Sequence, residues 1–197
     1  LALIEQNQLI EDLPVASDIL RKGINRKVLY LALLLHDIGK GRKEDHSKLG
    51  SKLASKVCSR LGLNKSESEM IEWLVENHLL MSDVAQKRDL SDPRTVRDFA
   101  TVVKSRTKLK LLTVLTICDI RGVGPEVWNN WKAQLLRKLY HITYKALSSG
   151  LEDIGAIATV DEAQHTLKKK LVNWDPKIIE QELGRHYKSY WQGLNSE

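Results

Sequence analysis

The sequence contains no run of about 18 consecutive apolar residues, so it predicts no transmembrane helix. The first residues, LALIEQNQLIEDL, lack the basic flank and the small-residue cleavage site of a secretory signal peptide. Only two cysteines are present, and both lie within apolar helical patterns, so we expect buried, reduced thiols in a cytoplasmic protein. The first residues also lack a methionine and read like the inside of a helix. We therefore expect the chain to be a fragment of a longer protein.

Several catalytic signatures are also absent. The sequence has no glycine-rich phosphate loop, no G-x-S-x-G turn and no cysteine beside a catalytic base. A formal net charge of +6 and a pI near 9.2 would suit an anionic partner. However, the lysines and arginines mostly alternate with acidic residues, and the one tight cluster, at 168–170, is expected to be a solvated helix face. We therefore predict no nucleic-acid partner.

Helical patterns recur along the chain, and clear strand patterns do not. Residues 28–35 form an apolar run typical of a buried helix, and apolar residues recur every four positions from Leu49 to Leu61. Ser66 and Glu69 have the spacing of a capping box at the start of the next helix. The sequence therefore predicts an all-α fold.

Charged and imidazole side chains interrupt this apolar pattern at a few positions. His36 and Asp37 follow directly on the apolar run, and Asp119 and His78 each fall at helical spacing from inward-facing leucines. His46 stands at the start of the next helix, where its ring can face either way. An ionised carboxylate at the end of a buried helix is costly unless it is paired or binds a metal.

Each of these residues has an ordinary explanation when taken alone. A single inward-facing histidine is usually a hydrogen-bonded core residue, and a single inward-facing aspartate usually caps a helix or forms half of an ion pair. Together, however, they indicate a metal site, because helical bundles build such sites from side chains on separate helices. A mixed set of imidazole and carboxylate ligands suits Mn²⁺, Fe or Zn²⁺ better than it suits Mg²⁺, which favours sites made of oxygen ligands alone. The other histidines are expected to be structural or surface residues: His141, His165 and His186.

The segment HDIGK at 36–40, with the later Asp119, resembles the HD superfamily of metal phosphohydrolases. Three longer segments, 36–50, 76–93 and 118–140, are similar to the HD domain of the bacterial bifunctional uridylyltransferase/uridylyl-removing enzymes. In that family the domain removes UMP from a tyrosine of the PII nitrogen-signalling protein. The resemblance implies an all-α HD-domain helical bundle with metal-dependent phosphodiesterase activity.

The resemblance also implies a domain organisation and a set of partners. It implies an HD phosphohydrolase domain at 1–150 and a small helical extension at 151–197, of which 185–194 is similar to the segment leading to the family's C-terminal regulatory domains. The expected substrate is uridylylated PII, and the full-length chain would carry an upstream nucleotidyltransferase domain and downstream ACT-type domains. The nucleotidyltransferase motif is absent here, and so is the family's first metal-binding histidine, because residues 1–35 contain no histidine. We therefore expect the N-terminal ligand helix to be truncated and metal binding to be weak.

By the same resemblance, each polar residue has an expected role. His36, Asp37 and Asp119 would bind a divalent metal, and His46 and His78 match the positions that hold a second ion in two-metal relatives. The expected ion is Mn²⁺ or Mg²⁺ in preference to Fe or Zn²⁺.

Asp37 and Lys40 are the expected catalytic residues. Lys40 would neutralise a non-bridging phosphate oxygen, although a lysine after Gly39 is equally expected to be exposed. The leaving phenol has a pKa of about 10, which lessens the need for a general acid. Two alternatives remain open: an HD phosphohydrolase that acts on a free nucleotide or cyclic dinucleotide, and a non-catalytic helical regulatory module.

Overall fold

The structure is a computed structural model, and it describes residues 1–6, 8–11, 13–124, 127–149, 167, 171, 174–175, 178–180 and 185. The extension predicted at 151–197 therefore lies mostly outside the described residues. Residues 155–160, GAIATV, whose sequence is compatible with either a strand or a loop, also lie outside the described residues.

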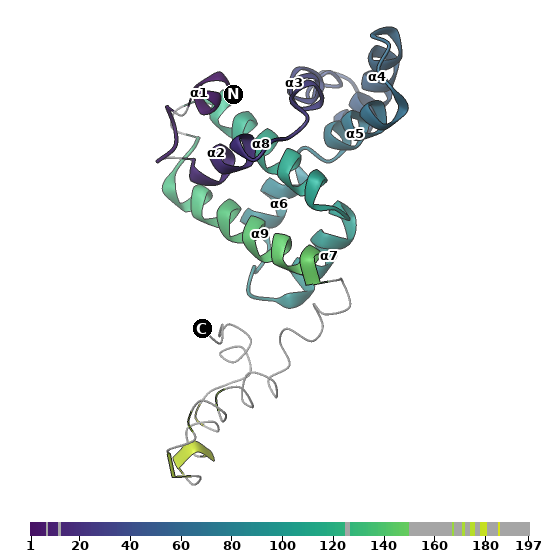
Figure 1. The fold of residues 1–197 in the computed structure, drawn as a ribbon. Helices are drawn as coiled ribbons and strands as arrows, with labels where there is room; N and C mark the ends of the chain where they lie inside the picture. Colours follow the sequence, from purple (N-terminus) through teal and green to yellow (C-terminus); the bar gives the residue numbers. More distant parts are fainter. Residues whose placement is uncertain are drawn as a thin grey trace.

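Nine helices occupy the described residues up to position 149 (Figure 1): α1 (Ala2–Glu5), α2 (Pro14–Arg21), α3 (Arg26–Leu35), α4 (His46–Arg60), α5 (Lys65–Glu76), α6 (Leu80–Lys87), α7 (Pro93–Val103), α8 (Arg106–Val123) and α9 (Asn130–Ser149). They contain more than half of the chain, and no described residue belongs to a strand. The all-α prediction is confirmed. Among the described residues, no helix combines the length and the apolar character that a bilayer span requires.

Helix α8 is the centre of the bundle. Every residue from 111 to 117 is buried, which means that this part of α8 is covered on all sides. It contacts six of the other helices, α2, α3, α5, α6, α7 and α9. Figure 1 shows α8 crossing the middle of the molecule with α9 beside it. An aspartate near the end of α8 is thereby held against the surrounding helices.

Helices α3 and α5 pack against α8, α4 packs against α5, and the three helices position the rest of the candidate site. The Asn25 side chain caps α3 and the Asp45 side chain caps α4, each by accepting hydrogen bonds from backbone N–H groups of the first turn. Such a cap stabilises a helix by about 1 kcal/mol. Helices α4 and α5 lie against each other over much of their length, and α5 also contacts α3. The ends of these three helices are therefore fixed relative to one another.

The capping box of α5 lies two residues before the predicted one. The Glu67 backbone N–H donates to the Asn64 side chain at 2.9 Å, and the Asn64 backbone N–H donates to the Glu67 carboxylate at 3.3 Å. The prediction of a box at Ser66 and Glu69 was wrong, because the helix already begins at Lys65. Both pairs have the right spacing, so the sequence pattern did not distinguish them.

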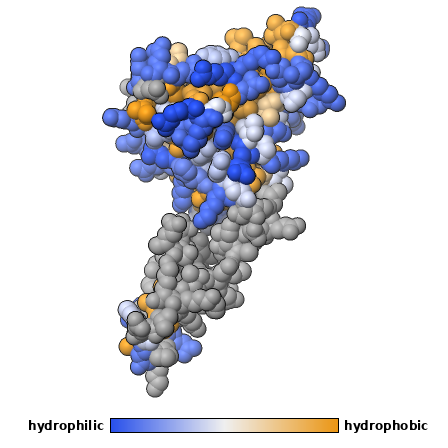
Figure 2. All heavy atoms as spheres, viewed as in Figure 1, coloured by the Kyte–Doolittle hydropathy of each residue, from blue (hydrophilic) through white to orange (hydrophobic). Residues whose placement is uncertain are grey.

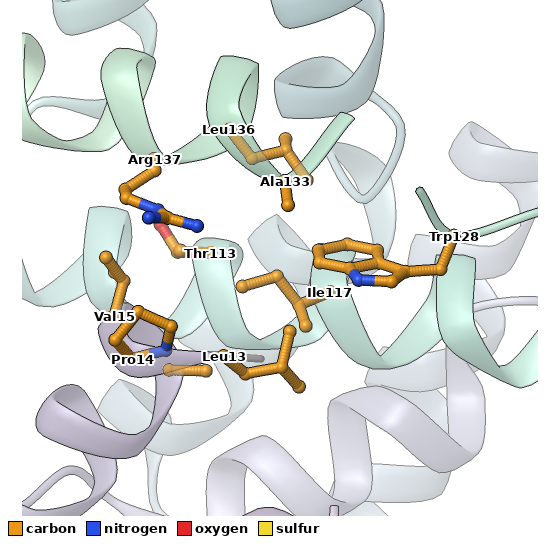
Figure 3. A pocket seen from close by; sticks show the side chains of 10 residues that line it. Leu13, Pro14, Val15, Thr113, Ile117, Trp128, Ala133, Leu136 and Arg137 are labelled. Atoms are coloured by element: carbon orange, nitrogen blue, oxygen red, sulfur yellow. The ribbon is translucent and has the colours of Figure 1, made fainter. Parts of the chain in front are cut away.

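A shallow cavity of about 270 Å³, open to solvent, lies between α2, α8 and α9 (Figure 3). The Trp128 ring and the Arg137 guanidinium border a lining that is otherwise mostly aliphatic, with Leu13, Ile117 and Leu136 among its members. None of the residues predicted to bind metal lines this cavity.

Candidate metal centre

The predicted ligands come from four helices whose ends meet at one corner of the bundle. His36 is the C-cap of α3, and Asp37 follows it in the turn after that helix. His46 is the first residue of α4, His78 lies just after the end of α5, and Asp119 lies in the last part of α8. The C-terminal ends of α3 and α5 carry partial negative charge, so the backbone at this corner also favours a cation.

The side-chain atoms of these five residues lie close together. His36 Nε2 is 3.2 Å from Asp119 Oδ1 and 3.3 Å from Asp37 Oδ2. His78 Nε2 is 3.8 Å from Asp37 Oδ1, and the rings of His46 and His78 have their centroids 5.5 Å apart. Two groups result, in each of which the possible ligand atoms lie within 4.8 Å of one another: His36, Asp37 and Asp119, and Asp37, His46 and His78. Asp37 belongs to both groups.

Two of the imidazole rings are oriented by backbone carbonyls. His36 Nδ1 lies 2.7 Å from the carbonyl oxygen of Leu33, and His78 Nδ1 lies 2.7 Å from that of Val75. A carbonyl oxygen can only accept, so each Nδ1 carries the proton and donates it. In a neutral ring this leaves the lone pair on Nε2, the atom that faces the carboxylates. Fixing a ring through its other nitrogen is how proteins usually prepare a histidine for a metal.

The Asp37 carboxylate gives the clearest sign that a cation belongs here. Its Oδ1 atom is shielded from solvent and has no hydrogen-bond partner among the described residues. His78 Nε2 lies 3.8 Å from this oxygen, and in the neutral ring it carries a lone pair, as the carboxylate oxygen does. Burying a charged acceptor without a partner is costly. A divalent ion between these atoms would satisfy both, so the residues fit the metal implied by the sequence.

The pKa values at the corner follow from the same contacts. The pKa of His36 is raised, chiefly because the protonated ring donates a hydrogen bond to Asp119, while burial opposes the shift. The same hydrogen bond is the main reason that the pKa of Asp119 is lowered. Burial is the main reason that the pKa of His78 is lowered, which favours the neutral ring. The hydrogen bond with Asp119 therefore favours positive charge at His36, whereas burial favours the neutral ring of His78.

The loop between α3 and α4 approaches α4 so closely that only glycine fits at position 39. A Cβ atom on Gly39 would lie 2.1 Å from the carbonyl oxygen of His46 and 2.8 Å from the backbone nitrogen of Gly50. A Cβ on Gly50 would in turn meet Val75 Cγ1 at 3.1 Å. These contacts hold the turn that carries Asp37 against α4 and α5. The close approach of the loop to α4 thus explains why the HDIGK segment has a glycine at position 39.

Lys40 lies at the edge of the centre. Its Nζ atom is 2.6 Å from Asp37 Oδ2, and its side chain is 64% exposed.

Of the histidines expected to be structural or surface residues, His141 is exposed on α9 and stacks edge-on against the Tyr140 ring. His165 and His186 lie outside the described residues.

The structure thus brings together all five residues predicted to bind metal, and their role as ligands stays a prediction. Sequence reasoning missed the carbonyl oxygens of Leu33 and Val75. Their signal is visible in retrospect, because each lies three residues before a histidine at the end of a helix.

The described fold and corner define a helical domain with a His–Asp centre suited to a divalent metal. The sequence profile of the HD domain family matches residues 8–120, which include all five of the residues predicted to bind metal. The chain therefore belongs to the HD domain family.

Three relatives are similar over nearly the whole chain, and each is named a bifunctional uridylyltransferase/uridylyl-removing enzyme. The protein of Cereibacter sphaeroides is 60% identical over 196 residues, which are 100% of this chain and 21% of the relative. That of Ruegeria pomeroyi is 59% identical over 197 residues, 100% of this chain and 22% of the relative. That of Azospirillum brasilense is 47% identical over 194 residues, 98% of this chain and 21% of the relative. The chain thus spans about a fifth of the length of these relatives, and no solved structure matches it significantly.

Proposed function

We propose that this chain is the hydrolase part of a bifunctional nitrogen-signalling enzyme and that it releases UMP from a uridylylated tyrosine of the PII protein. The observation that carries the proposal is the convergence of His36, Asp37 and Asp119, with His46 and His78 on the other side of Asp37. The similarity to enzymes named for uridylyl removal supports the choice of reaction.

We propose that His36, Asp37 and Asp119 hold one divalent ion, and that His46 and His78 complete a second position with Asp37. Mn²⁺ or Mg²⁺ is proposed over Fe or Zn²⁺. When bound, the ion supplies Lewis-acid activation of the phosphate and of a water nucleophile. The backbone carbonyls that fix His36 and His78 keep their Nε2 atoms directed at this position, which lowers the cost of assembling the site.

The chain's own residues supply the remaining parts of the reaction. Lys40 neutralises one Asp37 oxygen, and because its side chain is mostly exposed it can turn to a non-bridging phosphate oxygen when substrate binds. The leaving tyrosine oxygen has a pKa of about 10 and departs as a phenolate more readily than an alkyl alcohol would. Consistent with this, the proposed mechanism needs no separate general acid.

The proposal extends to the surroundings of the domain. In the full-length protein we place a nucleotidyltransferase domain upstream and ACT-type regulatory domains downstream, and we propose no nucleic-acid partner. Both cysteines are free thiols, which suits a reducing cytoplasm.

The test is UMP release from purified uridylylated PII by the full-length protein, measured with added Mn²⁺ and after chelation. The proposal predicts metal-dependent release of UMP. Hydrolysis of free nucleotides or cyclic dinucleotides without release from PII would favour a different HD phosphohydrolase. Full biological function in a metal-free preparation would favour a non-catalytic regulatory module.

A further inference from the structure

Four exposed aliphatic side chains belong to residues that lie close in the chain to the predicted ligands. The described residues include eleven large hydrophobic side chains that are exposed, and four of them lie within one helical turn of a predicted ligand: Leu34, Ile38, Leu79 and Val123, with exposed fractions of 76%, 37%, 40% and 70%. Isolated exposed hydrophobics are normal on protein surfaces. Four exposed aliphatic residues close to five predicted ligands are more than isolated cases. Figure 2 shows that, on one face of the molecule, hydrophobic patches interrupt a largely hydrophilic surface.

Chain geometry fixes these side chains near the site. Ile38 is bonded to Asp37, so their Cα atoms are about 3.8 Å apart. Leu79 follows His78 in the same way. Val123 lies four residues after Asp119 on α8, so the two side chains are neighbours on one helix face. Leu34 lies three residues before Asp37 at the end of α3. We call these four aliphatic residues the rim.

The rim and the adjoining loop differ in charge. The loop carries three exposed cations, Lys40, Arg42 and Lys43, beside the exposed acidic residues Glu44 and Asp45, and the cations suit the phosphate of a substrate. The rim carries no charge, so it suits an apolar part of whatever is attached to that phosphate. The base of a free nucleotide is present in uridylylated PII as well, so only the protein substrate adds an apolar polypeptide segment that could cover the rim.

On the basis of the proposed function, we propose that the rim binds an apolar stretch of the substrate protein next to its modified tyrosine. A phosphate held at the centre brings the tyrosine oxygen within a few bond lengths of Asp37 and Asp119. The chain that carries that tyrosine must then cross the rim. Burying part of Leu34 and Val123 would contribute to binding of the protein substrate and nothing to a small ester that ends at its leaving group.

The test compares two double variants of the full-length protein. Leu34→Gln with Val123→Gln removes apolar surface from the rim, and glutamine keeps the helical preference. Leu61→Gln with Val102→Gln is the matched control, because these are an exposed leucine and valine outside the rim. Each protein is assayed with Mn²⁺ for UMP release from uridylylated PII and for hydrolysis of uridine 5′-(4-nitrophenyl phosphate).

We expect the ratio of kcat/KM for the protein to kcat/KM for the ester to fall about tenfold in the rim variant, mainly through KM. The control variant should keep the ratio of the unsubstituted enzyme. An unchanged ratio in the rim variant, or an equal fall in the control, would overturn the proposal. If the unsubstituted enzyme cleaves the ester and releases no UMP from PII, the proposed function itself is wrong, and the rim loses its occupant with it.

Discussion

The metal centre and the core around α8 both bury polar side chains, but they treat them differently. In the core, the Thr113 hydroxyl donates to the carbonyl oxygen of Leu109, one turn back, at 2.7 Å. Within the part of the chain that the structure describes, the hydroxyls of Thr116 and Thr143 have no hydrogen-bond partner, but they are neutral, and leaving one unpaired costs roughly 1–3 kcal/mol. At the metal centre the unpaired atom belongs to the Asp37 carboxylate, for which the cost is larger.

This difference separates the core threonines, whose burial costs little, from the charged and imidazole side chains that the fold brings together at the metal centre. The core threonines lie within single helices and need nothing from elsewhere. The centre joins the ends of four helices, and its charges are balanced only against one another. Holding these charged groups together lowers the stability of the fold, which is typical of a functional site.

The largest effect should come from the carboxylate that both ligand groups share. Asp37→Ala should lower UMP release more than about 100-fold, because changes in the surroundings of metal ligands alone cost about 10–100-fold. Uridylyl transfer by the full-length protein should persist, since that chemistry uses other motifs. Asp92→Ala is the matched control: it removes the cap of α7, costs about 1 kcal/mol of stability and should leave UMP release intact. Equal loss of both activities in Asp37→Ala would indicate misfolding or a shared site.

Leu112→Ala should show the opposite pattern. Leu112 is fully buried in α8, and deleting most of such a side chain costs about 2–5 kcal/mol. Chemical denaturation should show this loss in the free energy of unfolding. UMP release, measured at a temperature where the variant stays folded, should remain close to that of the unsubstituted protein. Strong loss of activity in a folded variant would mean that the core and the centre are not separable.

Gly39→Ala probes the contact between the loop and α4. The added Cβ overlaps backbone atoms, so the turn carrying Asp37 must move, at a cost of about 1–3 kcal/mol. We expect reduced Mn²⁺ affinity by calorimetry together with lower stability. Gly122→Ala is the control, because outside its own helix no atom of the described residues lies within 4 Å of its Cβ position, and alanine is favoured in a helix by about 0.5–1 kcal/mol. If Gly39→Ala binds Mn²⁺ as well as Gly122→Ala does, the close contact is irrelevant to the centre.

The smallest effect is expected for Lys40→Ala. Lys40 contributes one partly solvated charge contact, so KM for uridylylated PII should rise by about fivefold. Lys87→Ala removes a similar exposed pair, Lys87 with Asp83 on α6, neither of which is a predicted ligand, and should leave KM unchanged. Kinetics on both variants at fixed ionic strength decide the matter. Indistinguishable KM values would remove Lys40 from the proposed reaction.

Much of the fold was predictable because helices have a local signal. The apolar run at 28–35 forms most of α3, although only Val28, Leu29, Ala32 and Leu35 are buried. Asp92 caps α7 at a proline, as such sequences usually do. The capping box of α5 was misplaced because Ser66 and Asn64 fit the same rule. Four of the five predicted ligands were recognisable as polar interruptions of the apolar pattern, whereas His46 stood at a helix start where its ring could face either way.

Other features of the site had no local signal. The contact of Gly39 with Gly50 joins a loop to a helix, and nothing near position 39 in the sequence reports that contact. The unpaired state of Asp37 Oδ1 depends on how α5 and α8 pack, so it is visible only in three dimensions. The exposure of Leu34 and Val123 was hidden because both belong to apolar helical patterns.

The central claim is that His36, Asp37 and Asp119 bind one divalent ion. The most direct measurement is anomalous diffraction at the manganese edge from crystals soaked in Mn²⁺, for the unsubstituted protein and for Asp119→Asn. The account predicts a peak about 2.0–2.3 Å from His36 Nε2 and from one oxygen each of Asp37 and Asp119, and its weakening or loss in the variant. No peak at this corner under saturating Mn²⁺, or a peak of equal strength in Asp119→Asn, would contradict it.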